Sequence, residues 1–439
     1  MEATLGGVQE DALLGPLSLS LADSPGASYI VQRRDSTTHS AIPSCSYAGV
    51  NVLRISLSSS TEWADLANGY LSYTIQNEAN APLQFIGQPH VSFSRLRILA
   101  GGQEIEDIQD YNRLCEMLQN FQSSETRLNA SYHGLPTQMA MVQADATHAD
   151  NPNLWRSEDH QPMAISNNGS ARVCVQFPLS AILGSANKKW MPLYAINGGL
   201  EILLTLANPT THLKTGLNSS AYRLTDIAYN CPMYTLDSAL QEKYFQSLAK
   251  GDALLIHSQQ FSHNEIFLTP SQGSFAVSLN KPVSRLATVF ISFVRELSAA
   301  DIQGGQTYVN TFDMFSDAAQ TIEHQLQIGS NNYPEMPVRG VSESWLRLMQ
   351  ALGVSQSLAH SLGVSYYDYI SKSFVLAYDT EKVSLAHATG VSTQGGQELR
   401  LSVKNLQPND GSVQMKRAYI ATHQDVIFEI RAGSVTKLD

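Results

Sequence analysis

Apolar and polar residues alternate in short runs along most of the chain, and turn-forming residues separate the runs. Within 171–179 the apolar residues Val173, Val175 and Phe177 occupy every second position, and the run at 199–207 repeats this pattern. A period of two predicts a β-strand with one buried face. The pattern also fixes which face is buried, because a slip of one residue would turn every apolar side chain toward water.

Strands predicted in this way occur throughout both halves of the chain. In the first half they lie near 50–58, 69–76, 90–99, 171–179, 199–207 and 222–235. In the second half they lie near 253–262, 273–279, 285–294, 321–328, 373–379, 397–404 and 413–431. Helical patterns are fewer, at 108–121, 238–251 and 342–353, and helices this short need packing against a sheet to be stable. This order of elements is typical of antiparallel sandwiches.

The two halves repeat an ordered set of features. Each contains a strand, a turn and then the pattern aromatic-x-Arg-Leu-x-x-x-Leu, which starts at Tyr111 in the first half and at Trp345 in the second. Further on, GGLEILLTL at 198–206 is matched by GGQELRLSV at 395–403. We therefore predict that one sandwich domain was duplicated, and that the helix at 238–251 joins the two copies.

The charge balance argues against a protein that condenses nucleic acid. The chain of 439 residues has a formal net charge of −11, and 15% of its residues are charged. The first fifty residues contain two basic residues, Arg33 and Arg34, against five acidic ones. Binding along a nucleic-acid backbone needs clustered Lys and Arg. No direct nucleic-acid partner is therefore expected, and the low charge content favours contact with other proteins.

Cysteine spacing and hydropathy predict a chain that folds in a reducing compartment. The four cysteines are far apart and include no CxxC pair, which predicts buried thiols and argues against a zinc site: Cys45, Cys115, Cys174 and Cys231. The N-terminus shows no basic segment followed by an apolar core of signal-peptide length, and 18 apolar residues never run together. Neither a signal peptide nor a transmembrane helix is expected.

The sequence contains no motif that requires catalysis. No GxxxxGK[ST], GxGxxG, HExxH or GxSxG pattern occurs. Asp379 and Glu381 could form a carboxylate pair, but the same spacing is typical of a solvated sheet face. The long stretch 122–170 holds acidic and histidine residues without the spacing of metal ligands: Asp145, His148, Asp150, Asp159 and His160. We predict no catalytic, metal-binding or cofactor-binding residue.

Residues 178–193 interrupt the strand pattern and contain Lys188, Lys189 and Trp190. Lysines beside a tryptophan could grip a phosphate and stack a base. Because the net charge is negative, a loop contact with a neighbouring subunit is the preferred interpretation, with these three residues as its candidates. Trp190 is expected to be buried mainly by another loop or another chain. In the second half, 379–396 is the corresponding connection.

Segments in both halves resemble double jelly-roll major capsid proteins, and the nearest branch is that of Polinton-like and virophage-type viruses of microbial eukaryotes. The resemblance rests on five segments in the family's order: RLRILAGGQEIEDIQDYNRLCEML, FPLSAILGSANKKWMPLYAINGGLEILLTLAN, QLQIGSNNYPEMPVRGVSESWLRLMQALG, FVLAYDTEKV and HQDVIFEIRAGSVTKLD. It extends from about residue 50 to the end and includes neither residues 1–40 nor 122–170.

The resemblance implies an all-β fold of two tandem eight-stranded jelly-roll sandwiches, with a few short helices in loops and linker. The implied divisions are an N-terminal arm at 1–45, a first jelly roll at 46–237, a helical linker at 238–251 and a second jelly roll at 252–439. The implied function is that of a major capsid protein and not an enzyme. Homotrimers would form pseudo-hexagonal capsomers that tile the icosahedral shell of a dsDNA virus.

The same resemblance implies partners and a location. The chain would contact itself, neighbouring trimers, and penton and minor capsid proteins, without a cofactor, while contact with an internal membrane stays open. It would fold in a reducing host cytoplasm or nucleus and reside in the virion capsid. Upright strands would place the loops at 178–193 and 379–396 on the outer face or at the rims between neighbours.

Two other interpretations stay open from the residues. A non-viral protein with two sandwiches could bind carbohydrate or a cell surface, and it would favour a signal peptide, paired cysteines or exposed aromatic rings at one loop end. A β-sandwich hydrolase would need two carboxylates about 5–10 Å apart in one cleft.

Overall fold

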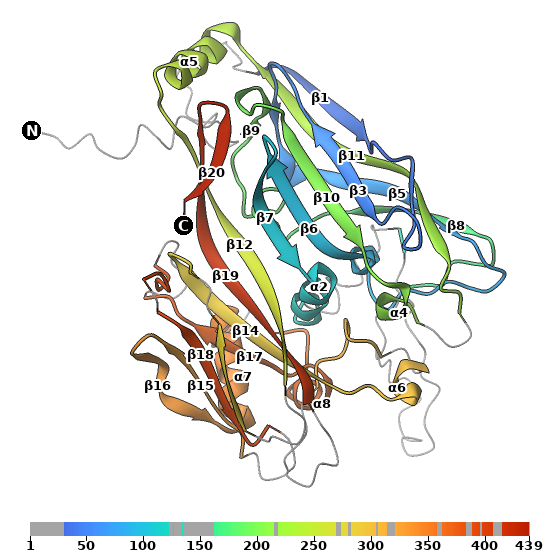
Figure 1. Ribbon diagram of the computed structural model, residues 1–439, viewed down its shortest axis with the longest axis vertical. Coiled ribbons are helices and arrows are strands. Elements are labelled where there is room, and N and C mark those ends of the chain that lie inside the picture. Colours follow the sequence, from blue (N-terminus) through green and yellow to red (C-terminus); the bar gives the residue numbers. More distant parts are fainter. Residues whose placement is uncertain are drawn as a thin grey trace, which may run out of the picture.

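The computed structural model describes residues 30–122, 126, 134–135, 162–214, 218–268, 274–279, 282–303, 306–313, 321–357, 362–382, 389–395, 397–406 and 415–438. These residues form two β-sandwiches that lie side by side, each built from two antiparallel sheets (Figure 1). In Figure 1 the first sandwich is coloured from blue to green and the second from yellow to red.

The first sandwich contains a large and a small sheet. The large sheet has the order β8 (Ser170–Val175), β5 (Tyr70–Asn77), β11 (Tyr222–Leu236), β4 (Trp63–Ala64) and β9 (Met191–Pro192), and β11 also pairs with β1 (Ile30–His39) and β2 (Ser44–Cys45). The small sheet has the order β3 (Val52–Leu57), β10 (Leu200–Leu206), β6 (Phe93–Ala100) and β7 (Gln103–Gln109).

The second sandwich is built in the same way. One sheet has the order β12 (Leu254–Phe267), β19 (Met415–Arg431), β14 (Leu286–Arg295) and β17 (Val375–Asp379), with β20 (Ser434–Leu438) also paired to β19. The other has the order β13 (Phe275–Leu279), β18 (Leu399–Lys404), β15 (Glu323–Ile328) and β16 (Asn331–Arg339).

Eight strands of each sandwich therefore correspond one to one. The set β1–β11–β5–β8 matches β12–β19–β14–β17, and β3–β10–β6–β7 matches β13–β18–β15–β16. A tight turn follows β6 and β15, and its first glycine has a left-handed backbone in both copies, with φ of +58° at Gly101 and +59° at Gly329. The all-β fold of two jelly-roll sandwiches is confirmed, and the shared order matches the predicted duplication.

Helices follow equivalent strands in the two copies. Helix α2 (Tyr111–Asn120) comes directly after β7, and α7 (Gly340–Ala351) comes directly after β16. The repeated aromatic-x-Arg-Leu pattern begins at the first residue of α2 but more than one turn into α7. No helix of the described residues combines the length and the apolar character needed to cross a bilayer.

The linker helix α5 (Ser238–Ala249) lies between β11 and β12, where the sequence predicts a joint. Its first turn is capped because the Asp237 side chain accepts a hydrogen bond from the Ala239 N–H. The remaining helices are short: η2 (Leu66–Asn68), η3 (Pro89–Ser92), η6 (Leu193–Ala195), α4 (Pro209–His212), α6 (Ala299–Gln303) and α8 (Tyr366–Lys372).

The core follows from the alternation seen in the sequence. In β3 and β10 the side chains of Leu53, Ile55 and Ile202 are fully buried between the sheets. The intervening positions face out, and there Arg54 and Glu201 form an ion pair at 2.5 Å. Truncating a buried leucine or isoleucine of this kind to alanine costs about 2–5 kcal/mol of stability.

Each strand predicted from alternation is present within a few residues of its expected bounds. The strands β1, β7, β16 and β20 are additional, as are the two-residue strands β2, β4 and β9. β1 lies inside the span predicted as an N-terminal arm. It pairs with β11 from Ile30 to His39 and is the counterpart of β12, so residues 30–39 belong to the first sandwich rather than to an arm. Residues 1–29 lie outside the described residues.

Candidate assembly site at the junction of the sandwiches

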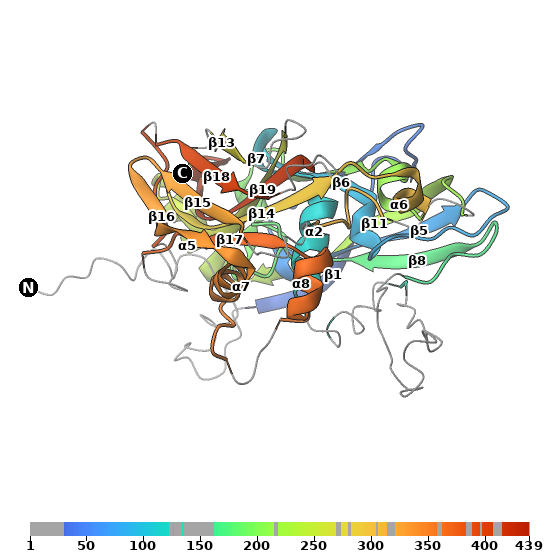
Figure 2. The same ribbon diagram turned by 90° about the horizontal axis from the view of Figure 1, so that it is seen from below.

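The two sandwiches meet where the edge strand β7 and helix α2 of the first approach the second. β7 lies against β12 and β20 of the second sandwich, and α2 occupies the middle of the molecule (Figure 2). In a chain without predicted catalytic groups, the relevant contacts are those that hold large surfaces together.

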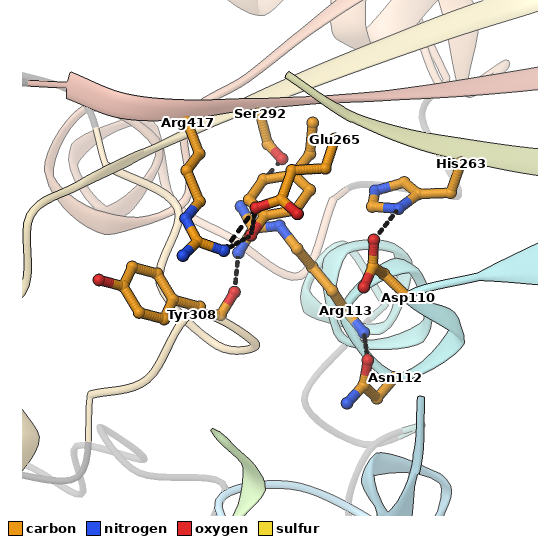
Figure 3. Close-up of polar contacts among 9 residues, drawn as sticks. Asp110, Asn112, Arg113, His263, Glu265, Ser292, Tyr308 and Arg417 are labelled. Carbon is orange, nitrogen blue, oxygen red and sulfur yellow. Dashed lines mark hydrogen bonds and ion pairs between the residues drawn. The ribbon is translucent and has the colours of Figure 1, made fainter. Parts of the chain in front are cut away.

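Arg113 of α2 reaches from the first sandwich into the second (Figure 3). Its guanidinium donates hydrogen bonds to the carbonyl oxygens of Tyr308 and Thr311 and to Ser292 Oγ, the latter two at 2.9 and 3.0 Å. Arg113 is only 2% exposed. A side chain of the first sandwich thus donates to two backbone carbonyl groups and one hydroxyl group of the second.

The same guanidinium lies over two aromatic rings of the second sandwich. Its central carbon is 4.5 Å from the ring centroid of Phe312 and 4.1 Å from that of Tyr419. Burial lowers the pKa of Arg113 to about 10, and the charges of Asp110 and Asp313 oppose this effect. The group is therefore charged at neutral pH. Because an uncompensated buried charge costs several kcal/mol, its partners in the second sandwich favour the contact between the two sandwiches.

Asp110, the residue that precedes α2, makes a second polar contact across the junction. Its Oδ2 is 3.3 Å from Nδ1 of His263 on β12. Burial alone would raise the pKa of Asp110, but the hydrogen bond from His263 and the charges of Arg113 and Arg417 outweigh burial, so the pKa is lowered. The carboxylate is thus ionised at neutral pH and complements the cations around it.

A third contact joins the excursion at 178–193 to both sandwiches. Glu106 of β7 accepts hydrogen bonds from Ser180 Oγ at 2.7 Å and from the Ala181 N–H at 2.6 Å. The Ala181 carbonyl in turn accepts one from Ser258 Oγ of β12 at 2.6 Å. Burial raises the pKa of Glu106 to about 7, against the opposing effects of these hydrogen bonds and of Lys437.

The structure therefore corrects the expectation that 178–193 forms an outer loop. Most of its side chains are buried, since the segment fills the junction. Trp190 is 3% exposed and stacks on Tyr234 of β11 with ring centroids 4.2 Å apart. A strand of its own chain thus covers it, and no second chain is needed to bury it. Lys188 is exposed and Lys189 is half-buried, so a contact of these lysines with another subunit stays a prediction.

The other sequence candidates do not form a reactive site in the described part of the chain. The Asp379 carboxylate accepts a hydrogen bond from the Glu381 N–H at 3.0 Å, so the two residues close a turn instead of presenting a carboxylate pair. Among the described residues, no three His, Cys, Asp or Glu side chains converge as metal ligands would. The four cysteines are free thiols. The acidic and histidine residues at 145–160 lie outside the described residues.

Sequence reasoning missed a buried polar group in the second sandwich. His324 of β15 contacts Tyr378 OH at 2.6 Å through Nδ1 and Ser344 Oγ at 2.8 Å through Nε2. Burial lowers its pKa to about 3. Through these hydrogen bonds the neutral ring links β17 and α7 to β15. In the sequence, the one signal that His324 faces the core was its place in the alternating series of positions 322, 324 and 326.

Comparison with solved structures decides the fold. Neither protein-family profiles nor curated protein sequences match the chain. The structure resembles the capsid of PBCV-1 with a TM-score of 0.57 at 11% identity, over 95% of this chain and 99% of that one. It also resembles a protein of the Sputnik virophage (0.52, 10% identity, 94% and 89% covered) and the Faustovirus major capsid protein (0.53, 7% identity, 94% and 92% covered). The fold is the double jelly roll.

The expected resemblance is thus confirmed, since these neighbours are double jelly-roll major capsid proteins. Both jelly rolls of the present chain are covered by the comparison, because more than nine-tenths of it is matched in each case. Arg113, Asp110 and Glu106 form the polar contacts by which the two jelly rolls of this chain meet.

Proposed function

We propose that this protein is a major capsid protein whose role is structural rather than catalytic. Three chains associate side by side, six jelly rolls form a pseudo-hexagonal capsomer, and capsomers tile the icosahedral shell of a dsDNA virus. The observation that carries this proposal is the double jelly-roll fold, shared over nearly the full length with capsid proteins of PBCV-1, Sputnik and Faustovirus.

The junction supports the proposal physically. A shell tile must transmit load between its two jelly rolls without bending, and a buried polar cluster with hydrogen bonds across the junction favours one relative orientation. Arg113 provides such a cluster in this chain. The free thiols agree with folding in a reducing host compartment, followed by incorporation into the virion.

Contacts beyond the capsomer belong to the same proposal. Neighbouring trimers, penton proteins and minor capsid proteins are the expected partners, and the exposed Lys188 with the half-buried Lys189 would contact a neighbouring subunit. Charged side chains at the rim of such a contact contribute mainly to the rate and specificity of association.

Negative-stain electron microscopy of the purified protein tests the proposal. Hexagonal blocks, and closed regular particles at higher concentration, are the expected result. Uniform small particles of single-chain size at every concentration would contradict it. If a cell-surface or carbohydrate-binding role were correct instead, a glycan array would show saturable binding by such single chains.

A further inference from the structure

A two-residue turn joins β19 to β20 at one end of the second sandwich. Arg431 pairs with Ser434 on either side of it, and the two turn residues, Ala432 and Gly433, have φ of +51° and +82°. A left-handed backbone at both positions is the geometry of a type I′ hairpin turn, in which Asn-Gly is the preferred pair. An alanine side chain is strained in this conformation, so the surroundings of the turn must hold Ala432 there.

The turn packs on the first sandwich. The Gly433 carbonyl oxygen accepts a hydrogen bond from the Asn197 N–H at 2.8 Å. A Cβ atom at Gly433 would clash with the Asn197 side-chain amide, and one at Gly101 would lie 3.9 Å from the Gly433 carbonyl oxygen. The turn at 432–433 therefore meets two turns of the first sandwich, the one between β6 and β7 and the one that precedes β10.

Beyond the turn, β20 runs beside β7, which is the edge strand of the small sheet (Figure 1). The charge of Lys437 on β20 acts to lower the pKa of Glu106 on β7, against the larger effect of burial, so the two side chains lie near each other across the junction. Val435 of the same strand is 1% exposed and joins β20 to the core. β20 thus lies against a strand that its own sheet pairs on one side only.

β20 is additional to the eight strands that the two sandwiches share. The set β12–β19–β14–β17 matches β1–β11–β5–β8 without it. Within the second sandwich β20 pairs with residues 427–431 of β19, and β12 pairs with residues 427–430 on the other side of that strand. Detaching β20 would break this short ladder and leave the eight shared strands of each sandwich paired.

We propose that β20 and its turn act as a clasp on the junction of the two sandwiches. When the clasp is closed, it rests on the turns before β7 and β10 and covers β7. When it opens, β7 and Glu106 become more accessible to water while both sandwiches stay folded. A strained turn and a short ladder at the end of a sheet are elements of low stability, which open before a core does. The clasp works within one chain, so this inference goes beyond the proposed function and does not depend on it.

Hydrogen exchange in the full chain, read by mass spectrometry, measures this opening. Gly433→Ala forces a methyl group against Asn197 and is expected to speed amide exchange in β7 about tenfold. Exchange in β14 and β18, which lie in the body of the second sandwich, should stay at the wild-type rate. Gly395→Ala is the matched control, because Gly395 also has a left-handed φ of +74° but no heavy atom of the described residues, its chain neighbours apart, would lie within 4 Å of the new Cβ.

A second variant keeps the test decisive if Gly433→Ala fails to fold. Ala432→Asn introduces a residue that tolerates a left-handed backbone, and it is expected to slow exchange in β7 about threefold relative to the wild type. Equal exchange of β7 in Gly433→Ala and Gly395→Ala would overturn the clasp. Faster exchange spread evenly over both sandwiches, or an unchanged rate in Ala432→Asn, would overturn it as well. The oligomeric state tests the proposed function separately.

Discussion

At the scale of single residues, the junction depends on a few buried polar groups whose partners belong to the other sandwich. Arg113 is the clearest case, because its donors meet two carbonyl oxygens and a hydroxyl of the second jelly roll. Removing its side chain would remove these hydrogen bonds and would create a cavity between two rings.

Arg113→Ala is therefore expected to lower the free energy of unfolding by about 2–4 kcal/mol. Arg113→Lys should recover only part of this loss, since an ammonium group cannot reproduce the planar contact with Phe312 and Tyr419. The matched control is Arg347→Ala, which removes a surface pair within one helix and should change the stability of the single chain by less than about 0.5 kcal/mol. Urea unfolding measures all three, and equal losses for Arg113→Ala and Arg347→Ala would contradict the role of Arg113.

Glu106 makes the junction sensitive to pH. Its pKa is raised to about 7 in the folded chain, above the value of about 4.5 in the unfolded chain, so the folded state binds the proton more tightly. The protonated Glu106 side chain therefore stabilises the folded chain. This stabilisation is complete below about pH 4.5 and is lost as pH rises toward 7. We expect Glu106→Gln to match the wild type at pH 5 and to exceed it by about 2–3 kcal/mol at pH 8.

The difference between wild type and variant isolates this group. His212 and His324 have pKa values lowered to about 4 and about 3, so they change stability in the opposite sense over part of the same range. Glu104→Gln provides the control, because Glu104 lies on the same strand but pairs with Arg97 on the outer face at 3.9 Å. Thermal unfolding between pH 5 and 8 is the measurement, and a difference that does not grow with pH would rule out this titration.

The sequence predicted part of this site and not the rest. The repeated pattern singled out Arg113 and Arg347 together, yet only Arg113 is buried. The local sequence does not distinguish the two arginines, because the burial of each depends on whether the other sandwich of the same chain lies over its helix. Trp190 was singled out by its unusual surroundings, but its covering residue, Tyr234, is 44 positions away.

At the scale of elements, the alternation of apolar and polar residues predicts strands that have one solvent-exposed face and one buried face. β10 and β3 have such faces and were found within two residues of their bounds. β1 and β16 are edge strands that are largely exposed on both faces, and Pro334 and Pro337 of β16 also reduce its strand propensity. Edge strands of this kind lack the pattern because no core selects their residues.

The two equivalent turns provide a test at this scale. Alanine at Gly101 or Gly329 must adopt a left-handed backbone, which costs about 1 kcal/mol. At Gly101 a Cβ would also lie 2.8 Å from the Asn197 carbonyl oxygen, whereas at Gly329 it would meet the flexible Gln397 side chain at 3.2 Å. Gly101→Ala should therefore be the more destabilising of the two in urea unfolding, and the reverse order would contradict the turn geometry.

At the scale of the whole molecule, an internal repeat explains why one chain carries both a covered and an uncovered copy of the same surface. Within the described residues, the second sandwich covers β7 of the first, whereas Met336 of β16 and Leu346 of α7, in the equivalent elements of the second, are exposed. The self-association proposed above would give these exposed side chains a partner. The sequence pattern aligns the equivalent strands of the two sandwiches only approximately, and the sheet order of the structure aligns them strand by strand.

The most direct test of the central claim is the native mass of the purified wild-type protein, measured by sedimentation equilibrium over a wide range of concentration. Closed threefold assembly predicts a species of three times the 48.0 kDa of one chain, stable on dilution. A mass of one chain at every concentration, or an even-numbered assembly, would contradict it.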